Sequence, residues 1–432
     1  MKILNWKSLS ATERDAALSR PRRLRGKTLF TDVQTIIHQV QRQGDAALLS
    51  YAKQFDHVNL KSMAVTEKEF AAADKALDPQ VKAALIEAIG RISRWHEAGM
   101  AKAYSVKTAP GVHCGRIIRP IRRVGLYIPA GSAPLPSTVL MLAVPARLAG
   151  CPEVVLCSPA QADGRIDPAI LVAAKLCGVS KVFKTGGAQA IAAMAFGTKS
   201  IPRCDKLFGP GNAYVSTAKM IVQAMPDGPA IDMPAGPSEV LVIVDAESNA
   251  GFAAADLLAQ AEHGPDSQVL CLSDSAEKLR EILSEVKRQS EQLPRRAIIA
   301  KALRYARLIQ VDTIDQAIAL SNRYAPEHMI LAIEDAEAKL PLVSAAGSVF
   351  LGQWAPESLG DYCSGTNHTL PTNGFARAYS GVSVASFQLF ISTQKVSRKG
   401  LRAIGPCAET LARCERLDAH ANAVSIRLKA AS

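Results

Sequence analysis

Two polar residues near the end of one predicted helix could hold a metal ion. In LLAQAEHGPD (257–266), Gln260 and His263 precede Gly264 and Pro265, a pair that is typical of a helix end. Three residues apart on a last helical turn, Gln260 and His263 would share one face and could ligate the same ion. A histidine that interacts with the carboxyl end of its helix is the commoner arrangement, and spacing alone favours that simpler interpretation.

Adjacent Glu327 and His328 form a second candidate. They lie in RYAPEHMIL (323–331), between an expected helix and an expected strand. Neighbouring side chains project in different directions, so the two would suit separate proton-transfer roles at one site. A polar surface turn explains the pair equally well.

Two further segments carry possible zinc-site groups. The irregular stretch 354–381 is rich in Gly, Pro, Asn and Thr, and it contains Asp361 and His368. Long loops inside compact proteins are usually functional, and both residue types ligate zinc. Near the C-terminus, CERLDAHANAV (414–424) adds Glu415 and His420, although terminal segments are polar by default.

Repeated alternation of short apolar runs with helical segments begins near residue 122. Such alternation predicts parallel strands joined by crossover helices. We expect two α/β units, which divide between Asp232 and Ser238. The predicted strands span 122–130, 152–160, 181–187 and 206–211 in the first unit, and 239–245, 268–274, 307–312, 329–335 and 348–352 in the second.

Helical spacing of apolar residues marks both ends of the chain. It predicts helices over 31–55, divided at Gly44, and over 79–100. The region from about Val382 onward is expected to be mainly helical, with a final strand over 422–428. We expect this region to be an appendage of the second unit.

Glycine-rich turns recur between predicted strands and helices. In an open parallel sheet, ligands bind beside the carboxyl ends of strands, where helix N-termini offer free N–H groups to phosphates. The G-x-G-x-x-G fingerprint is missing, and each turn alone is weak support because turns need glycine anyway. Together they favour a dinucleotide or phosphate ligand; they span 127–134, 185–190, 208–214 and 233–239.

The composition is that of a globular protein. The 432 residues are 48% hydrophobic and 21% charged, enough for a large core and more than one domain. The net charge of +12 invites a nucleic-acid interpretation, but the basic residues are dispersed and only 5% of residues are aromatic, so we expect no nucleic-acid partner.

The cysteines and apolar segments indicate the compartment. The nine cysteines include no C-x-x-C pair, which favours reduced thiols in the cytoplasm. No signal-peptide pattern opens the sequence, and its most apolar window is too short to span a membrane. We therefore expect a cytoplasmic protein without a membrane partner.

Eight segments taken together resemble the histidinol dehydrogenase family, in the family's order and at its spacing, over about residues 25–428. The segments are VGLYIPAGSAPLPSTVLMLAVPA, GGAQAIAAMAFGT, FGPGNAYV, DMPAGPSEVLVI, QAEHGPDSQ, YAPEHMI, GDYCSGTNHTLPT and AHANAV. The resemblance implies NAD-dependent oxidation of L-histidinol through L-histidinaldehyde to L-histidine, in the last steps of histidine biosynthesis, with one Zn²⁺ per subunit. This four-electron oxidation would use two NAD molecules in turn.

The resemblance also assigns roles to individual residues. The implied zinc ligands are Gln260, His263, Asp361 and His420. Glu327 and His328 would be the catalytic acid–base pair. Substrate contacts would come from Ser238, His328 and Glu415 together with the zinc ligands, with His368 in a supporting role. Cofactor contacts would come from Tyr127, Gln189 and Asn212.

The resemblance implies an α/β fold of two related, incomplete Rossmann-like parallel-sheet units and a homodimer in which a helical tail crosses to the partner. The expected parts are a helical N-terminal arm (1–25), a larger α/β domain with the zinc and catalytic residues (26–130 plus 238–381), a second α/β domain that contributes NAD contacts (131–237), and the dimer-crossing tail (382–432).

Three other functions compete with this one. A zinc hydrolase could use a Glu/His pair, but it would not need four glycine-rich turns. A zinc- and NAD-dependent dehydrogenase of the same fold could act on another alcohol, although Ser238 and Glu415 favour histidinol. A binding module without catalytic activity would have no need of an acid–base pair.

Overall fold

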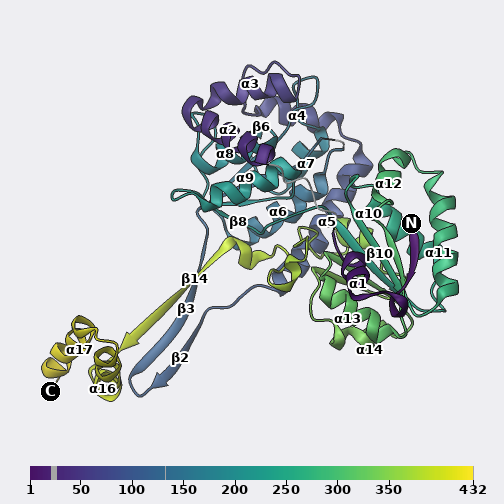
Figure 1. The fold of residues 1–432 in the computed structure, drawn as a ribbon. Coiled ribbons are helices and arrows are strands. Elements are labelled where there is room, and N and C mark those ends of the chain that lie inside the picture. The colour runs from purple at the N-terminus through teal and green to yellow at the C-terminus, as the bar shows by residue number, and fades with distance from the viewer. Residues whose placement is uncertain (21–26, 132, 432) are drawn as a thin grey trace.

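The computed structural model describes residues 1–20, 27–131 and 133–431. Figure 1 shows two α/β units side by side and a long arm that projects from them and ends in two helices. Among the described residues, none of the helices combines the length and apolar character needed to cross a bilayer. The boundary predicted at 25/26 lies outside the described residues.

A parallel sheet of five strands forms the first unit, in the order β6-β5-β4-β7-β8. Its strands are β4 (Arg123–Tyr127), β5 (Glu153–Ser158), β6 (Lys181–Lys184), β7 (Lys206–Phe208) and β8 (Ala230–Ile231). One face packs against α4 (Glu67–Ala76), α5 (Pro79–Ala98), α6 (Pro136–Ala149) and α7 (Pro168–Leu176). The other packs against α2 (Lys27–Gln43), α3 (Asp45–Phe55), α8 (Gly187–Phe196) and α9 (Ala213–Ala224). Both faces are buried, which explains why its strands are almost continuously apolar.

A parallel sheet of six strands forms the second unit, in the order β1-β11-β10-β9-β12-β13. Its strands are β1 (Lys2–Asn5), β9 (Glu239–Val244), β10 (Gln268–Ser273), β11 (Arg307–Gln310), β12 (His328–Ala332) and β13 (Ser348–Leu351). One face packs against α10 (Ala250–Ala261), α11 (Ala276–Ser290) and α12 (Arg296–Ala302). The other packs against α1 (Ala11–Ala17), α13 (Ile314–Tyr324) and the start of α14 (Ala336–Lys339).

The two sheets share one topology. With strands counted in chain order within each unit and β1 set aside, both follow the order 3-2-1-4-5. This is the Rossmann order without its sixth strand. The prediction of two related, incomplete Rossmann-like units is confirmed.

Short elements complete the chain: η1 (Trp6–Ser8), η2 (Leu340–Leu342), α15 (Glu357–Tyr362), η3 (Phe375–Arg377) and η4 (Val384–Phe387).

The packing corrects the predicted division of the chain. The region 26–130 was grouped with 238–381, yet helices α2 to α5 cover the five-stranded sheet, and β4 is its central strand. The N-terminal segment is not only helical, because β1 pairs with β11 as an edge strand. The start of the C-terminal region packs on the first unit, not the second, through Val382, Val384 and Phe387. Apolar spacing identifies helices but does not say which sheet they cover.

The arm is an antiparallel ribbon that the sequence analysis did not predict. It consists of β2 (Tyr104–Ala109), β3 (Val112–Pro120) and β14 (Gln388–Val396), followed by α16 (Arg398–Cys414) and α17 (Asp418–Ala431). In Figure 1 these two helices lie at the tip of the ribbon, away from both units. The strand predicted over 422–428 is wrong. That segment belongs to α17, and Leu428 packs against Gly405 of α16, where an added Cβ would lie 3.0 Å from it.

Phe387 offers a test of how the C-terminal region is anchored. Its ring is fully buried and stacks on Phe208 with centroids 3.9 Å apart. We expect Phe387→Ala to lower the free energy of unfolding by about 3–5 kcal/mol, because a large buried ring leaves a cavity. Denaturant unfolding measures this. Phe30→Ala, at an exposed phenylalanine of α2, should cost less than about 1 kcal/mol; equal effects would contradict the packing described.

Candidate active site

A cluster of polar side chains around Glu327 and His328 lies between the two sheets. It stands where the amino ends of the strands of one sheet meet the carboxyl ends of the strands of the other. Glu327 and His328 stand at the amino end of β12, and Glu239 begins the neighbouring strand β9. From the other unit, Thr138, at the start of α6, lies beside the loop that carries His368. The Thr138 hydroxyl is 3.4 Å from Nε2 of His368. The site therefore joins the amino edge of the six-stranded sheet to the carboxyl edge of the five-stranded sheet.

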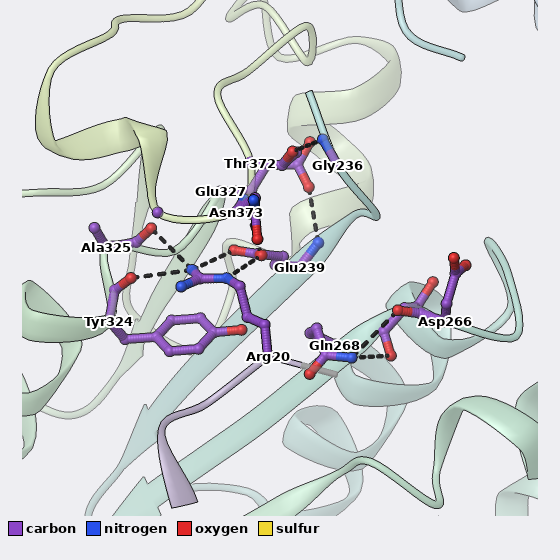
Figure 2. Close-up of polar contacts among 12 residues, drawn as sticks. Arg20, Gly236, Glu239, Asp266, Gln268, Tyr324, Ala325, Glu327, Thr372 and Asn373 are labelled. Carbon is purple, nitrogen blue, oxygen red and sulfur yellow. Dashed lines mark hydrogen bonds and ion pairs between the residues drawn. The ribbon is translucent and has the colours of Figure 1, made fainter. Parts of the chain in front are cut away.

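The backbone of Glu239 binds both members of the predicted catalytic pair. Its N–H donates to Oε2 of Glu327 at 2.8 Å, a contact drawn in Figure 2. Its carbonyl oxygen lies 3.2 Å from Nδ1 of His328. A carbonyl oxygen can only accept, so Nδ1 carries the proton and Nε2 keeps a free lone pair. The parallel pairing of β9 with β12 thus fixes both side chains.

Two carboxylates of α15 approach the same imidazole. Oε1 of Glu357 lies 3.3 Å from Nδ1 of His328, and Oδ1 of Asp361 lies 3.6 Å from its Nε2. Asp361 is also 3.9 Å from Nδ1 of His368. Nε2 of His328 and Oε2 of Glu357 are buried, and neither has a hydrogen-bond partner. Unmet buried polar atoms of this kind are expected where a ligand or ion binds.

Burial dominates the electrostatics of the cluster. Loss of solvent lowers the pKa of His328 to about 3 and that of His368 to about 4, so both imidazoles are neutral near neutral pH. Loss of solvent raises the pKa of Asp361 to about 7. Burial, reinforced by neighbouring carboxylates, raises the pKa of Glu327 and Glu357 well above the usual range. With both imidazoles neutral, these carboxyl groups have no positive charge from His328 or His368 to balance them.

Gln260 and His263 lie at the end of α10, which packs against α15. Gln260 is 0% exposed, yet neither its amide oxygen nor its amide nitrogen has a hydrogen-bond partner. His263 follows the helix and keeps one side at the surface. Burial, followed by the charge of Arg295, lowers its pKa. In its protonated form His263 would further lower the pKa of both His328 and His368, which places it near them.

These residues fit a divalent metal ion. A ligand atom from each of His328, Glu357 and Asp361 lies within 4.8 Å of the other two. The unpartnered Gln260 amide could supply an oxygen ligand and the neutral imidazole of His263 a nitrogen ligand, a mixed set suited to zinc. A cation would also relieve the repulsion that raises the pKa of the carboxyl groups.

The predicted cofactor residues lie at the carboxyl edge of the five-stranded sheet. Tyr127 ends β4, and its hydroxyl accepts a hydrogen bond from the Gly187 N–H at 3.2 Å. Gln189 is buried in the first turn of α8. Asn212 caps α9 by accepting hydrogen bonds from the next helical N–H groups. All three therefore shape glycine-rich turns at helix N-termini, where phosphates bind.

A buried ion pair fixes the turn after β7. Lys219 pairs with Asp232, and both side chains are almost fully buried. Lys219 donates to the carbonyl oxygen of Gly209, and Asp232 accepts from its N–H. Gly209 has φ +124°, and a Cβ there would lie 2.1 Å from the carbonyl oxygen of Tyr127. Only glycine lets this turn approach β4 so closely.

The remaining predicted residues are dispersed. Ser238 directly precedes β9 and is partly buried, one residue from Glu239. Glu415 and His420 are exposed, and they lie where α16 ends and α17 begins. In Figure 1 these helices stand at the tip of the arm, apart from the rest of the site. Within one chain, the structure does not bring Glu415 or His420 to the other candidates.

Three acidic residues of the site were not predicted from the sequence. Glu357 precedes Asp361 by one helical turn, and Asp256 precedes Gln260 by the same interval, so i, i+4 spacing to a candidate ligand could have revealed both. Burial raises the pKa of Asp256 to about 7. Glu239 gave a different signal, because a glutamate that opens a fully apolar strand needs a buried partner.

The chain is similar to known proteins over its full length. The model of a family described as histidinol dehydrogenase matches residues 20–428. A relative of that name from Xanthomonas axonopodis pv. citri is 59% identical over 100% of both chains, and one from Vibrio parahaemolyticus is 49% identical over 99% of both. The crystal structure of histidinol dehydrogenase from Elizabethkingia anophelis is 48% identical, with a TM-score of 0.95 over 99% of this chain and 98% of that one.

The raised pKa of Asp361 predicts a pH-dependent loss of stability in metal-free protein. Burial raises this pKa from 3.8 to about 7, so the folded state holds the proton more tightly than the unfolded chain does. The associated stability is present below about pH 4 and is lost as the pH rises to about 7. Relative to Asp361→Asn, chelator-treated wild-type protein should become less stable over that range and then level off.

Calorimetric melting temperatures of both proteins at several pH values measure this difference. Asp227→Asn, at an exposed aspartate, is the control and should give no such trend. A melting-temperature difference between wild type and Asp361→Asn that stays constant from pH 4 to pH 8 would contradict the raised pKa of Asp361.

Proposed function

The chain belongs to the histidinol dehydrogenase family, and on that premise we propose that it oxidises L-histidinol through L-histidinaldehyde to L-histidine, with NAD as hydride acceptor and zinc as a bound cofactor. Family membership makes it an oxidoreductase of histidine biosynthesis. The observation that carries the mechanism is the neutral His328 imidazole, whose Nε2 is free while Nδ1 is held by Glu239.

One Zn²⁺ per subunit would be held by Gln260, His263 and Asp361, with His420 of the partner subunit as the fourth protein ligand. The unpartnered Gln260 amide and the low positive charge among buried carboxyl groups support this assignment. The zinc would bind the amino and imidazole nitrogens of the substrate and so orient its alcohol group.

His328 would act as the base in the first oxidation. Its free Nε2 would take the proton of the substrate hydroxyl, while the hydride of the same carbon leaves to NAD. The carbonyl oxygen of Glu239 would stabilise the imidazolium through Nδ1–H. The loss of one hydride and one proton converts the alcohol to the aldehyde.

Glu327 would act between the two oxidations. An aldehyde has to add water before it can give up a second hydride, and a carboxylate can accept a proton from that water. Burial raises the pKa of Glu327, and a bound zinc ion would lower it again, so the ionised form could act as the base while it keeps the hydrogen bond from the Glu239 N–H. As water adds, the His328 imidazolium would return its proton to the aldehyde oxygen. The neutral imidazole would then take a hydroxyl proton of the hydrated aldehyde while the second hydride leaves to a second NAD, which gives the carboxylic acid.

The carboxyl edge of the five-stranded sheet would bind NAD. Tyr127 and Gln189 lie at the start of α8, and Asn212 lies at the start of α9. The start of α8 has no side-chain cap, so its first N–H groups would meet the pyrophosphate. Ser238 directly precedes Glu239, and His368 lies between Thr138 and Asp361, so both would contact the substrate. The nine free cysteines support a reducing compartment, the cytoplasm.

The arm would complete the site of a second subunit in a homodimer. Its ribbon and helices expose several large apolar side chains in one chain, namely Tyr104, Val106, Leu389, Phe390, Ile391, Leu411, Leu417 and Ile426. Exposed apolar surface of this extent marks an interface. The crossing arm would deliver His420 to the partner's zinc and Glu415 to the imidazole of its substrate.

The first test is the stoichiometry of the reaction. Wild-type protein with L-histidinol and NAD should give two NADH per histidine, and a chelator should abolish turnover until zinc is restored. We expect Glu327→Gln to lower the overall rate by about 10²–10⁴-fold and to release aldehyde, because water activation is lost. Absorbance of NADH and chromatographic histidine measure this. Absence of NADH from the zinc-loaded protein would refute the substrate assignment.

The second test asks whether one site uses two chains. His420→Ala and Glu327→Gln should each be inactive, yet an equimolar mixture after exchange should regain about a quarter of wild-type activity. About half of its dimers are mixed, and one of the two sites in each mixed dimer has an intact body and an intact arm. Both proteins are mixed under exchange conditions and assayed. The matched control mixes Glu327→Gln with His263→Ala, both in the body, and should restore nothing. Failure of the first pair to recover would contradict the crossing arm.

A further inference from the structure

A partly buried arginine from the N-terminal segment stands directly behind the catalytic pair. Arg20 lies after α1, and its guanidinium binds the carboxylate of Glu239 with two hydrogen bonds, Nε to Oε1 at 2.5 Å and Nη2 to Oε2 at 2.8 Å. The Glu239 side chain is fully buried. Figure 2 shows this pair beside Tyr324 and Ala325, with Glu327 close to Glu239.

The same guanidinium binds the backbone that leads into the catalytic pair. Nη2 donates to the carbonyl oxygen of Tyr324 at 3.0 Å and lies 3.4 Å from that of Ala325. Its central carbon lies 3.8 Å from the centroid of the Tyr324 ring. Ala325 has φ +54°, a left-handed conformation that alanine seldom adopts. Arg20 therefore holds a strained turn two residues before Glu327.

Glu239 receives a further contact from the loop that follows His368. The Asn373 N–H donates to Oε1 of Glu239 at 2.9 Å, and the neighbouring Thr372 hydroxyl accepts from the Gly236 N–H. One buried carboxylate thus joins the N-terminal segment, this loop and β9. Through its backbone, the same residue binds Glu327 and His328.

We propose that Arg20 is a positioning residue for the oxidation. By fixing Glu239 and the 324–325 turn together, it sets the orientation of the Glu327 carboxylate and the His328 imidazole. Arg20 suits this role because its planar guanidinium can bind a carboxylate with two parallel hydrogen bonds. One of the same nitrogens can also donate to a backbone carbonyl oxygen. The inference rests on the proposed function, since it assigns a consequence for turnover to this network.

The main test separates positioning from substrate binding. In Arg20→Ala, kcat for L-histidinol should fall about 10–100-fold, as expected when catalytic groups shift by a fraction of an ångström to 1 Å. KM should stay within about threefold and zinc content should be unchanged, because Arg20 contacts no residue of the proposed zinc ligand set. Arg20→Lys, which keeps the charge but not the fork, should recover part of kcat.

Matched variants distinguish this effect from loss of folding. Arg20→Ala leaves a buried carboxylate unpaired and should lower the melting temperature. The double variant Arg20→Ala with Glu239→Gln removes both charges, so it should melt nearer to wild type and still have a low kcat. Arg323→Ala breaks an exposed ion pair with Asp15 that anchors the same segment; its kcat should match wild type.

A readout that needs no turnover keeps the two proposals distinguishable. Hydrogen exchange at the Glu239 amide, which donates to Glu327, should be about tenfold faster in Arg20→Ala than in wild type or Arg323→Ala. If the wild-type protein is inactive, the proposed function is refuted. The exchange rate of the Glu239 amide would then still test whether Arg20 positions the catalytic pair. Unchanged kcat and exchange in Arg20→Ala, or a double variant with wild-type kcat, would overturn the inference.

Discussion

Three carboxyl groups around one imidazole, with a fourth beside them, impose the constraint on which the site depends. Glu327, Glu357 and Asp361 lie at or near His328, and Asp256 acts on Glu357 from the neighbouring helix. All four are nearly removed from water. Ionised carboxylates are costly in such surroundings unless a cation or a hydrogen-bond donor meets them. Their common requirement for positive charge supports the proposals that the site binds a metal ion and that its substrate is an amino alcohol.

The topology provides opposite environments at the two edges that meet. The carboxyl edge of the five-stranded sheet presents helix N-termini, whose partial positive charge suits an anionic dinucleotide. At the amino edge of the six-stranded sheet, α10 ends, and the partial negative charge of its C-terminus lies beside Gln260 and His263. That end suits a cation. Placing an amino edge against a carboxyl edge would therefore separate the proposed cation from the phosphates of the proposed dinucleotide and leave the reacting carbon between them.

Local sequence patterns predicted the central elements well and the peripheral ones poorly. Strands such as β9 and β10 are buried on both faces, so their apolar runs are unambiguous. The ribbon of β2, β3 and β14 is mostly exposed, so it lacks that signal, although the turn at Pro110–Gly111 could have indicated a hairpin. Residues 422–428 were predicted as a strand because alternation over a few residues resembles one, whereas Ala421, Leu428 and Ala431 follow helical spacing.

The candidate site illustrates the same limit. Glu327, His328, Gln260 and Asp361 were identified through family resemblance, because spacing alone left simpler alternatives open. The partners that give them chemistry, Glu357 and Arg20, were not identified. Arg20 is separated from Glu239 by 219 residues, and no local pattern records so distant a pairing. A buried charge is visible in the sequence as an anomaly, but its partner is defined only by the folded chain.

Under the proposed assembly, folding and association become parts of one process. In a single subunit the apolar surface of the arm is exposed and the proposed cation site lacks His420. Exchange of arms between two subunits would bury that surface and supply His420 to each site. The body can form its sheets and its Glu239–Arg20 network within one chain, because every contact of that network is internal. The acid–base pair is therefore prepared before association, whereas the metal site is completed by it. Zinc affinity, more than the geometry of Glu327 and His328, should then depend on protein concentration.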